Sequence, residues 1–277
     1  MQRTQFLTPF AASLVLAALG CTLSCSVIID TKTKQCDSNA DCAALSSTAT
    51  CSADHVCVGA AASLGCQEEP KSTAETVTLT FDVSLTSPPS DPTKRMPFTI
   101  HACKTTDPTC AAPITDDLIV PYGEVASLEV PPGFEGYLEV NNPDGLPAME
   151  FLGRPINVDT HGYDLIVPTP ATVLLLVALT GETYSTDNGI FVITTRDCMR
   201  QPLAGVSVQN TLGGTPFIFQ NMSPQKTLTE TTDEGAAGFV NVPAGIGFVS
   251  AKKGGAPLTG TSVFSRGGWV TYVEIFP

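Results

Sequence analysis

The sequence predicts a mainly β protein in which two tandem β-sandwiches follow a small disulfide-rich module. Three observations lead to this fold class. Several segments alternate apolar and polar residues with a period of two, which is typical of half-buried strands. Gly (23) and Pro (22) are frequent among the 277 residues, whereas charged residues make up only 15%. This composition favours strands joined by turns over amphipathic helices. Cysteines are also concentrated between positions 36 and 66, in a stretch with few large apolar side chains.

The chain begins with the features of an export signal. An apolar run over residues 6–20 ends in the motif Ala18-Leu19-Gly20-Cys21. Small residues that follow an apolar run mark a cleavage point. The motif resembles the lipobox of bacterial lipoproteins, whose cysteine is lipidated and becomes the new N-terminus. Thr22-Leu23-Ser24-Cys25 is a second candidate of the same kind.

The lipoprotein resemblance implies a signal peptide over residues 1–20 and a lipidated tether over residues 21–35. We expect the lipid, including palmitate, on Cys21, with Cys25 as the alternative. An ordinary cleaved signal peptide and an uncleaved anchor are the competing interpretations, although the apolar run is shorter than the roughly 20 residues of a spanning helix. The resemblance also implies attachment to the cell envelope. By resemblance to lipoproteins that are sorted on the residue after this cysteine, Thr22 implies the outer membrane, on its periplasmic or its surface side.

Residues 36–70 form the predicted disulfide-rich module. Its cysteines are separated by five, eight, five and eight residues: Cys36, Cys42, Cys51, Cys57 and Cys66. A segment this short and polar cannot bury a core, so disulfides in an oxidising compartment are expected to hold it. Four of these cysteines can pair with one another in three ways, of which Cys36–Cys51 with Cys42–Cys57 is weakly preferred. A zinc site is disfavoured because the segment has no CxxC pair and contains only His55. Calcium is disfavoured because the Asp37-x-Asn39-x-Asp41 pattern is followed by Cys42 in place of glycine.

The other cysteines give a parity argument about the lipid site. Cys103 and Cys110 flank six polar residues and are expected to close a loop. Lipid on Cys21 leaves one of the remaining cysteines unpaired. Lipid on Cys25 leaves an even number, which a Cys66–Cys198 disulfide would complete. Parity therefore favours Cys25, whereas the cleavage context favours Cys21.

Beyond residue 70 the sequence predicts strands. Thr76–Leu85 alternates strictly and is the clearest of them. The remaining predicted strands are Phe98–Cys103, Val125–Val130, Gly136–Val140, Ile190–Thr194, Val206–Gln209, Gly238–Val242 and Trp269–Phe276. The apolar run Ala171–Leu179 is interpreted as a strand buried on both faces, with a core helix as the alternative. A polar, turn-rich boundary at Gly181–Gly189 separates β-sandwich 1 (residues 72–182) from β-sandwich 2 (residues 188–277).

A weak internal repeat supports this division. Gly123–Gly133 aligns with Gly235–Gly245 at a constant offset, and each copy contains a strand that ends in a Pro-x-Gly turn. Chance similarity between two β-hairpins is the alternative explanation. The second copy belongs to a longer pattern that includes Asp197–Val208 with its Pro-Leu-x-Gly-Val turn, and Thr232-Asp-x-Gly before Phe239.

This longer pattern resembles the carboxypeptidase regulatory-like, or Cna-B-type, β-sandwich. The resemblance covers residues 188–277 and implies an immunoglobulin-like or transthyretin-like sandwich. Domains of this class act as spacers, stabilisers or binding modules. The wide gap between Val208 and Thr232 departs from compact members of the class. A cysteine-rich lead before such sandwiches is also similar to envelope lipoproteins of Gram-negative bacteria.

Charge and motifs exclude several functions. The net charge is −13 and basic residues form no cluster beyond pairs, so nucleic acid is not an expected partner. The sequence has no nucleophile elbow, no HExxH motif and no phosphate-binding loop. We therefore expect no catalytic residues, no metal site and no cofactor. His161, which lies between Asp159 and Asp164, is interpreted as part of a polar turn, with a metal site as the less favoured alternative.

The expected function is that of a non-enzymatic, lipid-anchored envelope protein that acts as a structural or protein-interaction module. Its partners would be the membrane, through the lipid, and an envelope protein or glycan. The alternative is a glycan- or small-ligand-binding lipoprotein, which requires an exposed cluster of Tyr137, Tyr163 and Trp269. An enzyme with an unrecognised site is a third hypothesis and requires carboxylates that converge in a pocket.

Overall fold

The computed structural model describes residues 38, 40, 50, 51, 57, 58, 66, 69–258 and 260–277. These belong to two compact units, residues 1–60 and 61–277. In the first unit, β1 (Thr50–Cys51) pairs antiparallel with β2 (Cys57–Val58), and Cys51 lies opposite Cys57. Other residues named in the predictions lie outside the described part of the chain: Cys21, Cys25, Cys36, Cys42 and His55.

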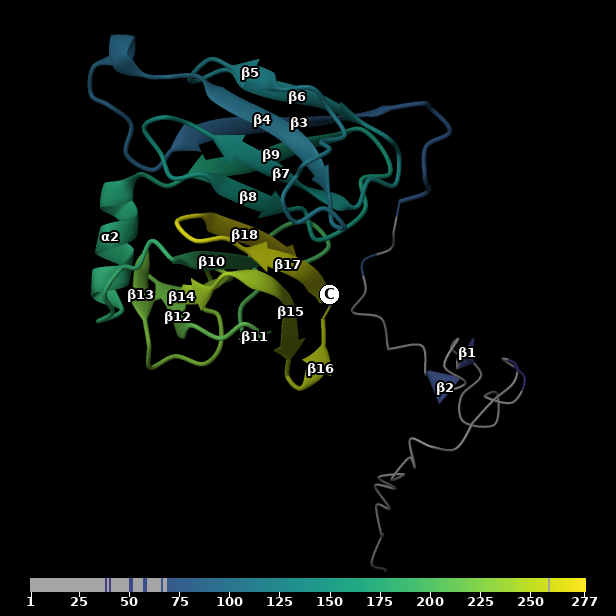
Figure 1. Ribbon diagram of the computed structural model, residues 1–277. Coiled ribbons are helices and arrows are strands. Elements are labelled where there is room, and N and C mark those ends of the chain that lie inside the picture. Colours follow the sequence, from purple (N-terminus) through teal and green to yellow (C-terminus); the bar gives the residue numbers. More distant parts are fainter. Residues whose placement is uncertain are drawn as a thin grey trace, which may run out of the picture. The chain divides into compact units, whose positions relative to one another are not determined.

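The second unit is mainly β and is built on a nine-stranded central sheet (Figure 1). The strand order is β13-β12-β14-β10-β18-β8-β7-β4-β5. The strands are β4 (Phe98–Lys104), β5 (Leu118–Val120), β7 (Gly136–Asn141), β8 (Ala148–Phe151), β10 (Asn188–Thr195), β12 (Thr215–Gln220), β13 (Ser223–Gln225), β14 (Ala236–Pro243) and β18 (Val270–Ile275). The predicted fold class is thereby confirmed.

The two faces of the central sheet follow from the strand register. Residues that lie opposite each other in neighbouring strands point to the same face of a sheet. Leu138, Glu150 and Tyr272 are aligned across β7, β8 and β18 and define face A. Tyr137 and Phe151, which alternate with them, define face B.

A three-stranded sheet covers face A at the end formed by β4, β5 and β7. Its order is β6 (Val125–Val130), β3 (Val77–Leu85) and β9 (Thr160–Val167). Alternate residues of β3 are buried, as its period-two pattern predicts. Leu79 and Phe81 of β3 share one core with Ile100 and Leu138 of the central sheet. These layers form the first β-sandwich.

A second small sheet covers face B at the opposite end. It consists of β11 (Val206–Asn210), β15 (Gly245–Lys253), β16 (Ala256–Pro257) and β17 (Thr261–Ser265). Val249 and Val263 from this sheet pack against Phe191, Ile193 and Val273 of the central sheet. These layers form the second β-sandwich.

The two sandwiches share the central sheet, which their prediction as tandem units did not include. The C-terminal strand β18 pairs in parallel with β10 on one side and with β8 on the other. The register places Met149 of β8 opposite Thr271 of β18. Parallel strands are not joined by a short hairpin turn. Pairing between strands so far apart in sequence therefore leaves no turn motif by which it could be predicted.

The two copies of the repeat are strand–turn–strand connections between sheets. In the first copy the chain passes from β6 in the three-stranded sheet to β7 in the central sheet. In the second it passes from β14 in the central sheet to β15 in the four-stranded sheet. Neither copy is a hairpin, since its two strands belong to different sheets.

The interpretation of Ala171–Leu179 as a strand is wrong, because the segment forms the helix α2 (Pro170–Leu179). Pro170 occupies the first turn, where its missing N–H and fixed φ favour a helix. Gly181 follows the helix with a φ of 72°, a conformation typical of helix ends. Val173 and Val177, one turn apart, are buried against face A. In the described part of the chain, no helix has the length and apolar character of a membrane span.

Candidate functional site

Three strands of the central sheet carry a glutamate at a buried position. Glu139, Glu150 and Glu274 are 6%, 8% and 6% exposed. Buried carboxylates need a partner or must take up a proton. Their neighbours form one polar cluster on each face of the sheet, close to the β8–β18 pairing that joins the sandwiches. These two clusters are the candidate site.

The Glu274 cluster lies on face A. The Arg200 guanidinium contacts Glu274, with 3.1 Å between Nη2 and Oε2, and Arg196 Nε lies 3.7 Å from Oε1. The Arg200 guanidinium also stacks over the ring of Tyr163, 3.5 Å from its centroid. Both arginines follow β10 in the second sandwich, whereas Tyr163 belongs to β9 in the first. The cluster therefore connects the two sandwiches.

Burial changes the acidity of the two carboxyl groups on this face. It raises the pKa of Glu274, against the opposing effect of Arg200 and Arg196. It raises the pKa of Glu150 well above the usual range, and the charge of Glu274 adds to this shift. The neutral acid of Glu150 is thus favoured over its carboxylate, because desolvation penalises the charged form.

The Glu139 cluster lies on face B. Arg266, in the turn between β17 and β18, forms an ion pair with Glu139, with 2.6 Å between Nη2 and Oε1. It also donates hydrogen bonds to the carbonyl of Pro108, at 2.7 Å from Nη2, and to the hydroxyl of Tyr137, at 3.1 Å. The Tyr137 hydroxyl in turn donates to the carbonyl of Asp107 at 2.6 Å. Burial raises the pKa of Tyr137 to about 12. Arg266 of the second sandwich thus contacts three groups of the first: the Glu139 carboxylate, the Pro108 carbonyl and the Tyr137 hydroxyl.

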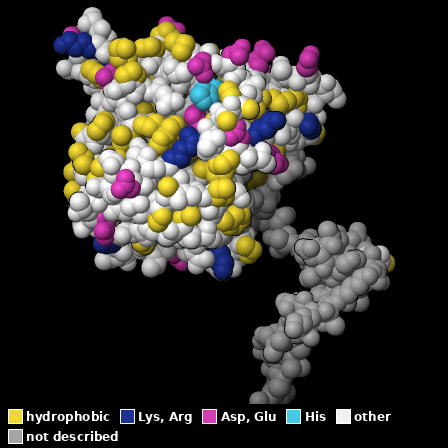
Figure 2. Space-filling view, in the orientation of Figure 1, with side chains coloured by type: hydrophobic (Ala, Val, Ile, Leu, Met, Phe, Trp, Pro, Cys, Tyr) yellow, Lys and Arg dark blue, Asp and Glu magenta, His cyan; other side chains and the backbone are white. Residues whose placement is uncertain are grey.

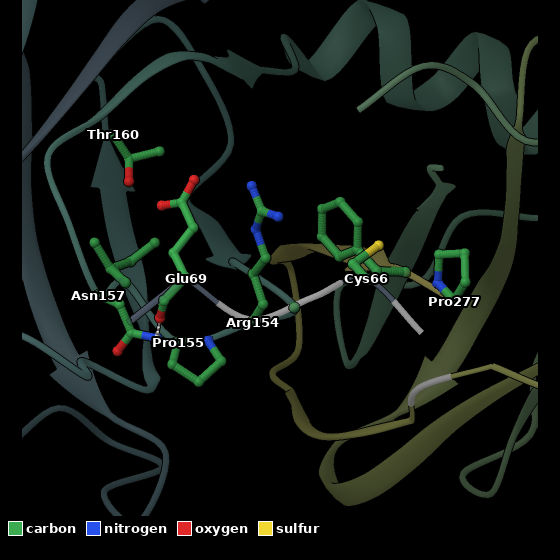
Figure 3. A pocket seen from close by; sticks show the side chains of 10 residues that line it. Cys66, Glu69, Arg154, Pro155, Asn157, Thr160 and Pro277 are labelled. Atoms are coloured by element: carbon green, nitrogen blue, oxygen red, sulfur yellow. Dashed lines mark hydrogen bonds between the residues drawn. The ribbon is translucent and has the colours of Figure 1, made fainter. Parts of the chain in front are cut away.

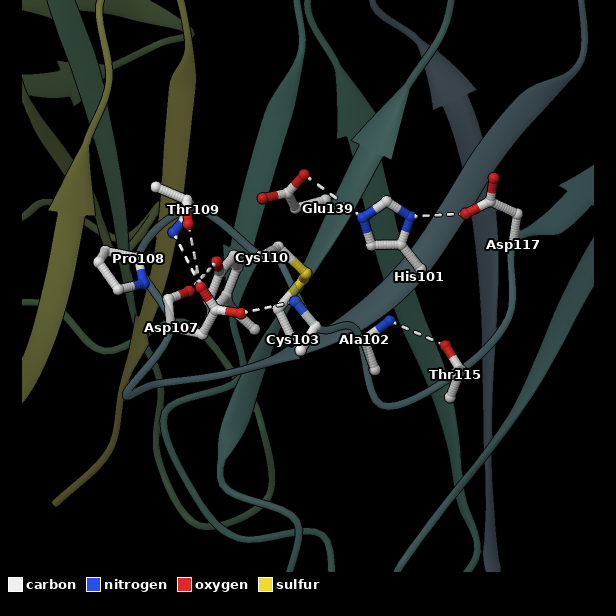
Figure 4. The surroundings of a disulfide bond; sticks show 12 residues. His101, Ala102, Cys103, Asp107, Pro108, Thr109, Cys110, Thr115, Asp117 and Glu139 are labelled. Carbon is white, nitrogen blue, oxygen red and sulfur yellow. Dashed lines mark hydrogen bonds and ion pairs between the residues drawn. A yellow bond between two sulfur atoms is a disulfide. The ribbon is translucent and has the colours of Figure 1, made fainter.

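A histidine and a disulfide adjoin the Glu139 cluster (Figure 4). His101 lies between two carboxylates, with 3.0 Å from Nδ1 to Asp117 Oδ1 and 3.4 Å from Nε2 to Glu139 Oε2. Cys103, two residues along β4, is bonded to Cys110. This disulfide closes the loop that the cysteine spacing predicts.

A second disulfide joins the lead segment, which runs from Cys66 to Ser72, to the second sandwich. Cys66 is bonded to Cys198 across a separation of 132 residues, which is the pair that the parity argument considered. The Cys66 amide also donates to the carbonyl of Pro277 at 3.4 Å. Asn157 forms two hydrogen bonds with the part of the lead segment that follows Cys66. Its side-chain amide donates to Glu69 O at 2.8 Å, and its backbone carbonyl accepts from the Ser72 amide at 2.9 Å.

The lead segment lines a pocket beside this disulfide (Figure 3). Glu69, Arg154 and Thr160 contribute its polar side chains. The Arg154 guanidinium stacks over the ring of Phe276, 4.9 Å from its centroid. The side-chain amide of Asn157, which also lines the pocket, is used to hold the backbone of Glu69. The Asn157 side chain therefore attaches the lead segment to the body at this pocket.

The aromatic cluster that glycan binding requires is not exposed. Tyr137 and Tyr163 are 0% and 2% exposed. Trp269 is half-buried against the second core, and the Arg266 guanidinium covers its ring at 4.5 Å from the centroid. The burial of these rings counts against the ligand-binding alternative.

One carboxylate near His161 makes a structural contact. His161 and Asp164 are exposed on β9. Asp159, just before this strand, accepts a hydrogen bond from the Thr78 amide at 2.8 Å and so fixes the start of β3. The prediction of a polar turn is therefore corrected, because His161 lies within strand β9, while the contact that Asp159 makes is structural.

Sequence reasoning missed both clusters. The available signal was a glutamate between apolar residues within a strand, as in Leu138-Glu139-Val140 and Val273-Glu274-Ile275. Such a position is costly unless a cation lies nearby in space. The arginines that supply the cations come from distant turns, which the alternation of a strand does not reveal.

No protein-family model and no curated protein matches the chain. Among solved structures, it is similar to S.CueP, with 17% identity, a TM-score of 0.25 and coverage of 34% of this chain and 62% of that one. It is also similar to GBS52, the minor pilin of Streptococcus agalactiae, with 12% identity, a TM-score of 0.23 and coverage of 72% and 95%. For the shaft pilin SpaA from Lactobacillus rhamnosus GG the identity is 9%, the TM-score 0.21 and the coverage 73% and 97%. The chain thus spans less than two thirds of the first of these proteins. The fold assignment rests on the strand register of this chain itself.

Proposed function

We propose that this chain is a non-enzymatic, lipid-anchored cell-envelope protein whose two sandwiches act as one stiff structural and protein-interaction module. The observation that carries the proposal is the shared central sheet, with a buried ionic cluster on each of its faces. A hinge between the sandwiches would have to break the β8–β18 pairing. It would also have to separate Arg266 from Glu139 and Arg200 from Tyr163.

The energetic cost of such a hinge supports a stiff module. Separating one member of a buried ion pair from the other costs about 3–5 kcal/mol, because a buried charge is left without compensation. On face B a hinge would break the Arg266–Glu139 ion pair. On face A it would break the stacking of Arg200 on the Tyr163 ring, since both partners of the Arg200–Glu274 pair belong to the second sandwich. Linked domains that move relative to each other have small, polar interfaces instead.

The attachment of the lead segment supports a role at an anchor. Force applied to the chain before residue 66 would pass through the Cys66–Cys198 bond directly into the second sandwich. It would bypass the first sandwich, whose strand β3 begins only at Val77. This arrangement suits a protein held by its N-terminus that presents its body to a partner.

The surface is compatible with contact to other envelope components. Figure 2 shows apolar side chains over much of the visible face and charged side chains in small groups. The whole chain contains 14 Lys and Arg residues against 27 Asp and Glu residues. A protein or neutral glycan partner fits this surface better than a polyanion does.

Intact-mass analysis of the exported protein tests the anchor, with Cys21→Ala, Cys25→Ala and the double variant beside wild type. We expect a mature form that begins at Cys21 and carries lipid, and loss of membrane association when that cysteine is replaced. A lipidated form that begins at Cys25 would follow the parity argument, which the Cys66–Cys198 disulfide supports. An unlipidated mature protein released from the cells would contradict the proposal.

Crosslinking in the native envelope, followed by mass spectrometry, tests the interaction role. We expect one dominant protein partner, captured by wild type and by a Glu129→Gln surface variant alike. Capture of glycan without protein would contradict a protein-interaction module and restore the ligand-binding alternative.

A further inference from the structure

Four side chains with metal-binding atoms converge on face B, beside the Glu139 cluster. His101 and Glu139 lie directly opposite each other on β4 and β7, and Cys103 follows His101 on the same face. The loop after β4 returns Cys110 to Cys103. The imidazole nitrogen, the two sulfurs and a carboxylate oxygen all lie within 4.8 Å of one another. In the described part of the chain, no other group of His, Cys, Asp and Glu residues is this close.

The loop that carries Cys110 is held in place by contacts other than the disulfide. The Asp107 carboxylate accepts hydrogen bonds from the amides of Thr109 and Ala112, at 3.3 and 2.9 Å. The Asp107 carbonyl accepts from Tyr137, and the Ile114 amide donates to Ala102 O at 2.7 Å. We therefore expect Cys110 to stay beside Cys103 when the bond between them is opened.

The histidine is oriented as a metal ligand. Its Nδ1 contacts Asp117 Oδ1 at 3.0 Å, which leaves Nε2 directed at Glu139. A carboxylate on the far nitrogen is the usual partner of a metal-bound histidine, because it fixes the ring and the tautomer. The imidazole is 16% exposed and the Glu139 side chain 8%. An ion could therefore enter from the histidine side.

Charge and geometry of the four ligands suit zinc. Two thiolates and one carboxylate carry one negative charge more than Zn²⁺ compensates, and Arg266, at 2.6 Å from Glu139 Oε1, supplies the balancing cation. Tetrahedral zinc with bonds of about 2.0–2.3 Å places its ligands about 3.3–3.8 Å apart. Separations of up to 4.8 Å have to shorten by about 1–1.5 Å to reach this geometry. The two sulfurs have to move apart by about 1.7 Å from their bonded distance.

We propose that reduction of the Cys103–Cys110 disulfide creates a zinc site formed by His101, Cys103, Cys110 and Glu139. A dithiol reductant, such as a thioredoxin-type protein, gives two electrons and two protons, becomes a disulfide itself and converts the cystine to two thiols. Zn²⁺ then displaces the two thiol protons, which pass to water. In the oxidised protein the sulfurs are bonded to each other and offer no thiolate, so the site is closed.

Cobalt and zinc titrations of the full chain test the proposal. Wild type, reduced with a thiol-free phosphine, is compared with the Cys103→Ser/Cys110→Ser variant, so that other reduced cysteines cancel. We expect wild type to bind one additional equivalent of Co²⁺, with the charge-transfer absorption of cobalt thiolates and the visible bands of tetrahedral cobalt. The Cys66→Ser/Cys198→Ser variant retains this signal, and the oxidised protein lacks it.

Variants of the other ligands separate a built site from adventitious thiol binding. His101→Gln and Glu139→Gln should each weaken Zn²⁺ binding at least about tenfold, and Asp117→Asn about 10–100-fold. The exposed His161→Gln serves as the control and should have no effect. Because Asp117 is a surface residue, with its side chain 62% exposed, its variant is expected to fold. Equal Co²⁺ binding by wild type and the double cysteine variant would overturn the proposal, as would unchanged Zn²⁺ affinity in His101→Gln and Asp117→Asn.

Discussion

At the scale of single residues, the molecule is defined by glutamates placed where strand alternation calls for apolar side chains. Glu139 and Glu274 are compensated by arginines. For Glu150, burial and the nearby charge of Glu274 raise the pKa well above 4.5. In the unfolded chain this carboxyl titrates normally. Its proton is therefore held more tightly in the folded protein than in the unfolded one.

This difference gives a pH-dependent stability with a definite sign. Below the ordinary pKa of glutamic acid Glu150 is protonated in both states and has no effect. As the pH rises above about 4.5 the unfolded chain loses the proton first, so stability falls until the folded pKa is reached.

Glu150→Gln removes this loss, and we expect it to be more stable than wild type at pH 8 by at least about 1 kcal/mol. The two should be equal at pH 4. Urea unfolding at both pH values measures this, and the exposed Glu129→Gln is the matched control. A variant without gain at pH 8 would contradict the burial of an uncompensated acid.

Arg266 should contribute more to stability than a surface arginine. Arg266→Ala leaves Glu139 buried without its cation and removes the hydrogen bonds to Pro108 and Tyr137. We expect a loss of about 3 kcal/mol in the free energy of unfolding. Glu139→Gln combined with Arg266→Ala should recover part of that loss, because no unpaired charge remains. Additive losses in this double-mutant cycle would show that the pair is not coupled.

At the scale of elements, α2 separates what the sequence shows from what it hides. Strands such as β3 and β6 were predictable because each buries one face, so that apolar residues alternate. The strand β8, which is buried at all four of its positions, was not predicted. The run Ala171–Leu179 has no such period. Its composition alone therefore could not distinguish a strand buried on both faces from a core helix. The decisive signals were at its ends, with Pro170 in the first turn and Gly181 after the last. The shared sheet and the two clusters were beyond prediction, because they depend on contacts between segments far apart in the chain.

Two substitutions in α2 test its orientation. Val177 is 1% exposed and packs on face A, whereas Leu175 is 60% exposed. Val177→Ala should lower the free energy of unfolding by about 2 kcal/mol, since it leaves a cavity. Leu175→Glu should change it by less than about 0.5 kcal/mol. The opposite ranking in thermal or urea unfolding would mean that the helix buries its other face.

The Cys66–Cys198 disulfide should stabilise the body by an amount comparable to the loss expected for Val177→Ala. It restricts the unfolded chain over a separation of 132 residues, for which about 2–4 kcal/mol is typical. We expect Cys66→Ser/Cys198→Ser to lose this amount relative to the oxidised wild type and to become sensitive to proteases before residue 72. The Cys103→Ser/Cys110→Ser variant, which opens a loop with a separation of only 7, is the comparison and should lose less. Equal losses would show that the lead segment is not fixed by its disulfide.

At the scale of the whole molecule, the central claim is that two sandwiches form one mechanical unit through β18. The last strand of the chain pairs with both halves, and each face of the sheet is closed by an ionic cluster near this junction. Separate domains of this size would be expected to unfold independently. A shared sheet instead predicts that neither half unfolds while the other remains intact.

Hydrogen exchange followed by mass spectrometry across a urea series measures this directly. Peptides from β3 and β9 report on the first sandwich, and peptides from β10 and β14 report on the second. We predict that all four lose protection at the same urea concentration, and that Arg266→Ala shifts them together. Two distinct midpoints, with one sandwich protected after the other has opened, would contradict the account.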